Sequence, residues 1–286
     1  METIGSQQIW SFVGPRQKSV PTSCREVRIS GGHRVGSFMD LAKKVAELQF
    51  MNRESVLLFR GQPRDYLNKR SATSLRPALF RASEATKTPS DSQLGKRFSV
   101  LLKAEKILVS GYGKKFPGFT RLNRQQVLRW AIIQHYEICD TPLLDVTHSL
   151  RVAASFASIR AEGKAFVFVL GVPQLSGAVT ASAEASLQIL RLSSVCPPSA
   201  VRPHIQEGYL LGEYPEVRNA NHRGAYKSYE LDFGRRLVGK FWFDPTEFWR
   251  ASGPFKRIGP RALYPNGDDP IFDLARSIKA KLKEDK

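Results

Sequence analysis

The chain has 286 residues, of which 42% are hydrophobic and 24% charged, proportions that are ordinary for a globular protein. It lacks an apolar run of about 18 residues and a secretory leader pattern, so we expect neither a membrane-spanning protein nor a membrane partner. Three widely spaced cysteines predict reduced thiols, and with them a cytoplasmic location, rather than a disulfide framework.

Charge is the unusual feature of the composition. The 44 Lys and Arg exceed the 26 Asp and Glu and give a formal net charge of +18. A field of this sign attracts polyanions, so nucleic acid is a possible partner of the basic surface. The basic residues are dispersed, however, and the alternative is a solvated, solubilising surface.

In the N-terminal half, residues 1–35 look irregular, and a helix capped by Ser37 follows them. A buried strand is expected at Val56–Phe59, broken by Gly61 and Pro63. Residues 82–95 are polar and predict a mobile loop. Further helices are expected over three ranges: 96–109, 124–135 (with Asn123 as a cap) and 150–160.

The second half is richer in apolar strands. They are expected at residues 165–172, 187–192, 205–212 and in the later "KFWFD". A last helix begins at Pro270 with Asp269 as its cap. Helices mainly in the N-terminal half and strands in the second predict a single α+β domain with a mixed or antiparallel sheet core.

The stretch "LLFRGQP" holds the first candidate ligand residues. An arginine directly after a buried strand, Arg60, would lie at a sheet end and could bind a phosphate or carboxylate with its guanidinium. Gly61 would let a ligand or a neighbouring backbone approach, and Gln62 completes the set. Alternatively, Arg60 satisfies a C-terminal carboxylate or backbone carbonyls.

Two more arginines, Arg76 and Arg81, lie in "TSLRPALFR". Together with Arg60 they would form an anion site. The alternative is a pair of surface arginines around an apolar anchor of Leu79 and Phe80.

The stretch "DVTHS" concentrates polar side chains where a strand meets a helix. Asp145, Thr147, His148 and Ser149 lie just before the helix N-terminus, whose N–H groups and dipole favour an anion. Thr147 or Ser149 could simply cap the helix, but capping needs only one of them.

Upstream of it, Tyr136 is a ligand candidate and His135 a candidate acid or base, although a lone histidine is more often structural. In "RPHIQEGYLLG", Gln206 and Glu207 are expected in a short strand, where neighbouring residues face opposite sides. If Glu207 points into a cleft, it is a candidate acid, base or ligand of a sugar hydroxyl; if it points out, it is solvated. No phosphate-loop, dinucleotide, serine-hydrolase or zinc motif occurs, so no metal is expected.

Five blocks of the chain resemble the FRG domain, a family of bacterial and phage proteins. They cover residues 57–62, 74–81, 130–157, 202–212 and 258–266. The resemblance extends over roughly residues 36–286, after an irregular segment 1–35. Members usually have Gly, Arg and Trp where this chain has Glu137, Pro142 and Val146.

The order of these blocks is similar to that of arginine–serine–glutamate ADP-ribosyltransferases. This similarity implies that Arg60 holds the pyrophosphate or ribose of NAD and that Thr147 braces the nicotinamide ribose pocket. It also implies that Glu207 or Gln206 contacts the ribose at the scissile bond, all in one cleft of ADP-ribosyltransferase type. The acceptor would be a nucleic acid or a protein, and the role that of a toxin or phage-defence effector. The alternatives are a basic nucleic-acid-binding module and a nucleotide sensor without turnover.

Overall fold

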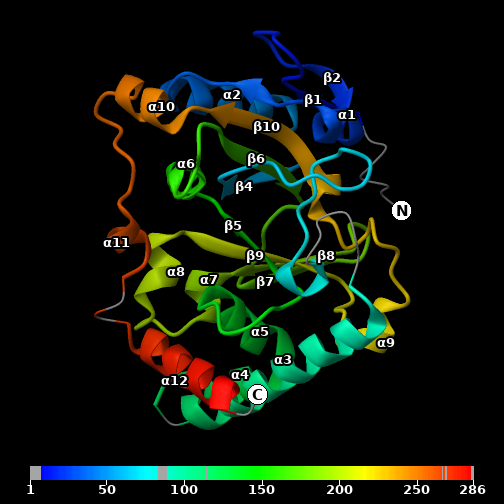
Figure 1. Ribbon diagram of the computed structural model, residues 1–286, viewed down its shortest axis with the longest axis vertical. Helices are drawn as coiled ribbons and strands as arrows, with labels where there is room; N and C mark the ends of the chain where they lie inside the picture. Colours follow the sequence, from blue (N-terminus) through cyan, green and yellow to red (C-terminus); the bar gives the residue numbers. More distant parts are fainter. Residues whose placement is uncertain (1–7, 83–88, 114, 266, 268, 285–286) are drawn as a thin grey trace. The chain divides into compact units, whose positions relative to one another are not determined.

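The computed structural model describes residues 8–82, 89–113, 115–265, 267 and 269–284. The chain divides into two compact units, each assembled from three segments (Figure 1). Unit 1 comprises residues 1–75, 146–175 and 232–263. Unit 2 comprises residues 76–145, 176–231 and 264–286. The boundary falls inside strand β5 (Leu144–Thr147), after Asp145.

Unit 1 is built on a mixed sheet. Its strands follow in the order β3 (His33–Arg34), β10 (Leu237–Phe243), β6 (Ala165–Val172) and β4 (Val56–Gln62). Strand β3 is parallel to β10, whereas β10, β6 and β4 are antiparallel neighbours. The end of β5 joins β4 through the pair Phe59–Thr147.

Three helices pack on one face of this sheet: α2 (Phe38–Met51), α6 (Leu150–Ser158) and α10 (Pro245–Ala251) (Figure 1). Their apolar side chains form a core with alternate residues of the strands, because successive strand residues face opposite sides. Ser37 caps α2 as expected, and its hydroxyl accepts a hydrogen bond from the Asp40 N–H.

The described part of residues 1–35, expected to be irregular, contains regular elements. Strands β1 (Gln8–Ser11) and β2 (Val20–Ser23) form an antiparallel pair, and α1 (Cys24–Ile29) follows. A capping box begins α1, in which Ser23 and Glu26 bond each other's backbone N–H. The Ser-x-x-Glu spacing was therefore the local signal for this helix, and the expectation for this segment was wrong.

Unit 2 is mainly helical. Its longer helices are α3 (Asp91–Tyr112), α4 (Phe119–Arg124), α5 (Gln126–His135) and α12 (Pro270–Glu284). Its short helices are α7 (Leu192–Val195), α8 (Val201–Ile205) and α9 (Ala220–Arg223). Its strands β7 (Val179–Ser182), β8 (Leu187–Arg191) and β9 (Gly208–Glu213) are antiparallel.

The remaining elements are turns of helix. In unit 2, η1 spans Ala78–Phe80. In unit 1, η2 spans Phe233–Arg236 and α11 spans Pro260–Leu263. The helices together with a mixed sheet confirm the α+β class.

Several predicted boundaries shift for local reasons. The strand at 165–172 is as expected, but the helix expected at 124–135 is interrupted because Gln125 has extended backbone angles. The capping box of Ser90 and Gln93 starts α3 at Asp91, inside the loop expected at 82–95, of which residues 83–88 lie outside the described residues. The helix expected to end at residue 160 ends at Ser158.

Candidate functional site

The FRG triplet lies inside strand β4 rather than beyond its end. Strand β4 pairs with β6 along its whole length, with Arg60 opposite Phe168 and Gln62 opposite Phe166. The expectation that Gly61 and Pro63 break the strand after Phe59 was wrong, because the ladder with β6 continues through Gln62. Arg60 is therefore held by a sheet and not by a loop.

Gly61 allows a neighbouring backbone to approach β4. A Cβ atom added there would lie 1.8 Å from the Ala153 carbonyl oxygen and 2.7 Å from the Ala157 nitrogen of α6. Such distances exclude any side chain, so the glycine lets β4 and α6 pack directly against each other. The sequence allowed either a ligand or a neighbouring backbone to approach Gly61, and the structure shows the backbone of α6 there.

Arg60 and Gln62 face away from α6. Because Leu57 and Phe59 belong to the core under α6, alternation places Arg60 and Gln62 on the opposite face of the sheet. Their cross-strand partners Phe168 and Phe166 lie on the same face, with ring planes 9° apart and centroids 6.1 Å apart.

Gln62 carries an unsatisfied acceptor. Its side chain is 6% exposed, and within the described residues its Oε1 atom has no hydrogen-bond partner. Leaving a buried polar atom unbonded costs about 1–3 kcal/mol. This amide oxygen is therefore a buried acceptor that the described residues leave without a donor.

Thr147 and Ser149 begin helix α6. The Thr147 hydroxyl accepts a hydrogen bond from the Ser149 N–H at 3.0 Å, whereas Ser149, the N-cap residue, makes no capping bond with its side chain. The pair Phe59–Thr147 places Thr147 on the α6 side of the sheet. Arg60 and Thr147 thus occupy opposite faces, and only a ligand at the strand end could contact both.

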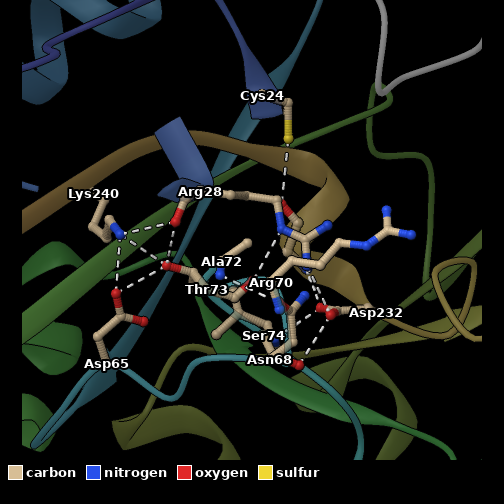
Figure 2. Close-up of polar contacts among 12 residues, drawn as sticks. Cys24, Arg28, Asp65, Asn68, Arg70, Ala72, Thr73, Ser74, Asp232 and Lys240 are labelled. Atoms are coloured by element: carbon tan, nitrogen blue, oxygen red, sulfur yellow. Dashed lines mark hydrogen bonds and ion pairs between the residues drawn. The ribbon is translucent and has the colours of Figure 1, made fainter. Parts of the chain in front are cut away.

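A buried polar network holds the loop that follows β4 (Figure 2). Lys240 of β10 lies in one cross-strand row with Phe168 and Arg60. Its ammonium group donates to Asp65 Oδ2 at 2.9 Å, to Thr73 Oγ1 at 2.9 Å and to the Arg28 carbonyl at 3.1 Å. All three donors of the lysine are used, which offsets the cost of burying its charge.

Asp232 forms the second half of this network. One carboxylate oxygen accepts from Arg28 Nη2 at 2.8 Å and from the Ser74 hydroxyl at 2.9 Å. The other accepts from the N–H groups of Leu75 and Gly234. The loop of residues 63–75 is thereby bound to both α1 and β10, which makes the support of Arg60 and Gln62 rigid.

Sequence reasoning missed this network. Its members are far apart along the chain, so no local spacing reveals them. A lysine inside the apolar strand "LVGKFWF" was the available signal, since a buried lysine requires an acidic partner.

In unit 2, each residue of "QHY" at the end of α5 is bound to a different segment. Gln134 donates to Asp145 Oδ2 and accepts from the Thr141 hydroxyl, which closes the turn before β5. Tyr136 donates to Asp269 Oδ2 at 2.7 Å. Burial, followed by this hydrogen bond, raises the pKa of the Tyr136 phenol.

Asp269 is the centre of these contacts. Besides Tyr136, its Oδ2 lies 3.2 Å from the Val201 and Arg202 backbone nitrogens at the start of α8. Its Oδ1 accepts from the Ile271 N–H and so caps α12 as the sequence predicted. One buried carboxylate therefore joins the ends of three helices.

His135 is a buried neutral imidazole. Its side chain is 3% exposed, and burial holds its pKa well below the usual range, with the Arg202 charge adding to the effect. A hydrogen bond to the Arg202 backbone acts in the opposite direction but is the weaker cause. Such a group binds α8 to α5 and is poorly suited to carry a proton near neutral pH.

Glu137 occupies the position at which the family usually has glycine. Its φ of +54° is left-handed, a conformation that glycine adopts without cost. Its carboxylate forms a 2.7 Å ion pair with Arg202, whose guanidinium also lies over the Tyr264 ring at 4.6 Å. The strained backbone is thus combined with a partner for a buried arginine.

Gln206 and Glu207 do not lie in a strand. Helix α8 ends at Ile205 and β9 begins at Gly208, so both residues form the turn between them. Glu207 has a left-handed φ of +43°, which interrupts the extended backbone. The expected alternation therefore does not apply: Gln206 is buried and Glu207 exposed because of this turn.

Arg76 and Arg81 flank η1 in unit 2. The Arg81 Nε donates to the Arg76 carbonyl at 2.7 Å, and Arg97 of α3 donates to the Leu79 carbonyl at 2.7 Å. Arg76 and Arg223 line a cavity of about 10 Å³, room for roughly one water molecule. A larger cavity of about 280 Å³ between α3 and α9 is lined by none of the predicted site residues.

The predicted site residues are divided between the units. Unit 1 holds Arg60, Gly61, Gln62, Thr147 and Ser149. Unit 2 holds the others: Arg76, Arg81, His135, Tyr136, Asp145, Gln206 and Glu207. Convergence of Arg60, Thr147 and Glu207 in one cleft stays a prediction.

The thiols offer no activated nucleophile. Burial raises the pKa of Cys24 to about 11 and that of Cys139 to about 12, and it raises the pKa of Cys196 further. Within the described ranges, no group of three His, Cys, Asp or Glu residues could hold a metal ion. In the same part of the chain, none of the helices is long and apolar enough to cross a bilayer.

Comparison with known proteins identifies one family. The FRG domain model matches residues 55–165, which include three of the five blocks noted in the sequence: 57–62, 74–81 and 130–157. No curated protein and no solved structure matches the chain. The matched segment begins at the strand that carries Arg60 and Gln62, and it includes "QHY" and helix α6. Residues 55–165 are therefore similar to the FRG domain family.

Proposed function

We propose that this chain is an ADP-ribosyltransferase-like enzyme that uses NAD to modify a nucleic acid or a protein. The observation that carries the proposal is that Arg60 and Gln62 lie on the same face of strand β4. A guanidinium suits the phosphates of a dinucleotide. The unsatisfied amide oxygen of Gln62 suits a ribose hydroxyl or the carboxamide N–H of nicotinamide.

Rigidity of the support favours a binding role for this face. Ligand groups must be held within a fraction of an ångström, and sites on strands are more precise than sites on loops. Strand β4 is fixed by β6 on one side and by α6 beneath Gly61. The loop after it is fixed by Lys240 and Asp232.

The proposed reaction breaks the bond between ribose C1′ and nicotinamide, whose nitrogen keeps the electron pair. A nucleophile of the acceptor then bonds to C1′ and loses its proton. Positive charge develops on the ribose, and a carboxylate stabilises it. Glu207 is our candidate, because it is exposed and its left-handed backbone is of the strained kind that often occurs at functional sites.

Thr147 has a supporting role in this scheme. Its hydroxyl holds the first turn of α6, so it would brace the ribose pocket through that helix. The proposed acceptor is a nucleic acid or a protein. Its identity decides whether the enzyme acts as a toxin or as a phage-defence effector.

The proposal is tested with NAD labelled in its adenosine part, incubated with the protein and cell extract. Released nicotinamide and labelled polymers are measured by mass spectrometry. Arg60→Lys keeps the charge but loses the planar fork, so we expect nicotinamide release to fall at least tenfold, as roughly one lost charge-assisted hydrogen bond predicts. Arg53→Lys, an exposed position before β4, is the matched control. Equal rates in the two variants would contradict the proposal.

Thermal unfolding with NAD and nucleic-acid binding, measured beside this assay, separate the alternatives. Thermal stabilisation by NAD with no nicotinamide released supports a nucleotide sensor. Absence of any NAD effect, together with nucleic-acid affinity that falls steeply with salt, supports a basic binding module.

A further inference from the structure

A strongly basic surface of unit 1 lies outside every residue assigned above. Unit 1 has 22 Lys and Arg against 10 Asp and Glu, whereas unit 2 has 22 against 16. Residues 253–261, "GPFKRIGPR", carry three of these cations and no acidic residue, and we call this segment the basic strap. The strap runs from α10 to α11 along the side of α6 (Figure 1).

Two hydrogen bonds fix the strap against α6. Arg151 Nε donates to the Lys256 carbonyl at 2.9 Å, and the Ile258 N–H donates to the Ser155 hydroxyl at 3.0 Å. The strap and α6 therefore form one continuous surface. Its exposed cations are Arg151, Lys256, Arg257 and Arg261.

Acidic residues are absent from both segments that build this surface. No Asp or Glu occurs between Asp145 and Glu162, or between Glu247 and Asp268. Solvated surfaces ordinarily intersperse both signs of charge, which limits a field of one sign. Neither segment supplies a carboxylate to its own cations.

Arg151 is placed against its local electrostatic preference. It lies in the first turn of α6, where the positive end of the helix dipole disfavours a cation, and no acidic residue of that turn offsets it. A cation that destabilises a helix start without a neighbouring acidic residue breaks a local rule, and such exceptions are expected at functional positions.

A partly exposed aromatic residue, Phe255, precedes two of these cations in the chain. Phe255 is 38% exposed, and its ring lies 5.1 Å from that of Phe38, which in turn stacks on Trp249 at 6.4 Å. A hydrogen bond from the Phe255 N–H to the Ser252 carbonyl holds the turn that presents it. The next two residues, Lys256 and Arg257, are exposed cations.

We propose that the basic strap and the start of α6 bind single-stranded nucleic acid. Cations placed along a groove or ridge contact successive phosphates, and an exposed aromatic ring stacks on a base of any sequence. An acidic peptide would use the cations but would gain nothing from Phe255. The proposal does not depend on NAD turnover.

The test measures fluorescence anisotropy of a labelled oligothymidylate of about 12 nucleotides, within the range of known single-strand site sizes. The double variant Lys256→Glu/Arg257→Glu is compared with Arg16→Glu/Arg25→Glu, which changes the net charge equally at exposed positions of the N-terminal segment. We expect the affinity of the strap variant to fall at least tenfold further than that of the control. Its salt dependence should decrease by about 0.7 in log–log slope for each phosphate that the variant no longer neutralises.

Phe255→Ala provides the independent readout. We expect about tenfold weaker binding with an unchanged salt slope, and recovery in Phe255→Tyr, because stacking carries no net charge. Thermal unfolding of each variant establishes that it is folded. If the charge variant fails to fold, the affinities of the two Phe255 variants still test the proposal.

Three results would overturn the proposal. One is an equal decrease of affinity in the strap variant and its charge control. Another is binding that Phe255→Ala leaves unchanged. The third is competition by polyglutamate as effective as by unlabelled oligonucleotide, which would assign the surface to an acidic protein.

Discussion

The FRGQ segment of β4 and the QHY segment of α5 are both short polar insertions in apolar surroundings, but their side chains differ in how they are satisfied. Gln134, His135 and Tyr136 each bond a different segment of unit 2, although the Nε2 atom of His135 has no partner among the described residues. In β4, Gly61 packs on α6 while the buried Gln62 oxygen has no partner among the described residues. QHY thus joins separate segments of unit 2 through Gln134 and Tyr136, whereas in FRGQ the Gly61 backbone packs on α6 and Gln62 is our candidate for contact with a ligand.

The largest expected effect separates the structural residue of FRGQ from its neighbours. In Gly61→Ala, the new methyl group would overlap the α6 backbone, which cannot move as a side chain can. We expect the free energy of unfolding to fall by more than about 3 kcal/mol, the upper range for overpacking. Urea unfolding measures it. Gly36→Ala, where nothing lies within 4 Å of the added carbon, should change it by less than about 1 kcal/mol.

The next effect tests whether QHY depends on Asp269. Asp269→Ala removes the acceptor of Tyr136 and of the first N–H groups of α8 and α12. We expect a decrease in stability of about 2–4 kcal/mol, from one cap and two further buried bonds. Asp273→Ala on the same helix, where the aspartate is exposed, is the control and should lower stability by less than about 0.5 kcal/mol. Equal decreases would show that Asp269 is not the centre of unit 2.

Much of the secondary structure could be predicted from the sequence because its signals are local. Strand β6 is a continuous apolar run, and Ser37 and Asp269 cap the helices that follow them. The Gln206–Glu207 turn could not be predicted, because a left-handed glutamate leaves no mark in the residue pattern. Nor could the network of Lys240, since strand pairing brings its members together from three separate segments.

The pH dependence of stability tests the neutral state of His135. Above pH about 6.5 the imidazole is neutral in both the folded and the unfolded chain, so it contributes no slope. Below this pH the unfolded chain binds a proton that the folded chain excludes, and the free energy of unfolding falls by up to about 1.4 kcal/mol per pH unit. The variant His135→Gln should lack the part of the pH dependence of stability that comes from His135. The remaining slope belongs partly to His33, whose pKa burial also lowers. Identical slopes between pH 7 and 5 would contradict the assignment.

The smallest effect concerns Glu137. Both Glu137→Ala and Glu137→Gly remove the ion pair with Arg202, but only glycine adopts the left-handed backbone without cost. We therefore expect the glycine variant to be more stable than the alanine variant by about 1 kcal/mol. Chemical denaturation of the two variants measures the difference. An alanine variant at least as stable as the glycine variant would show that the backbone at Glu137 is not strained.

The most direct test of the central claim is Gln62→Met, measured for both stability and NAD turnover. Methionine has a similar shape but no unsatisfied amide, so we predict an unchanged or higher free energy of unfolding. At the same time we predict loss of nicotinamide release from NAD, because the hydrogen-bond acceptor proposed for the ligand is gone. Unchanged nicotinamide release in a stable Gln62→Met protein would contradict the claim that this face of β4 binds NAD.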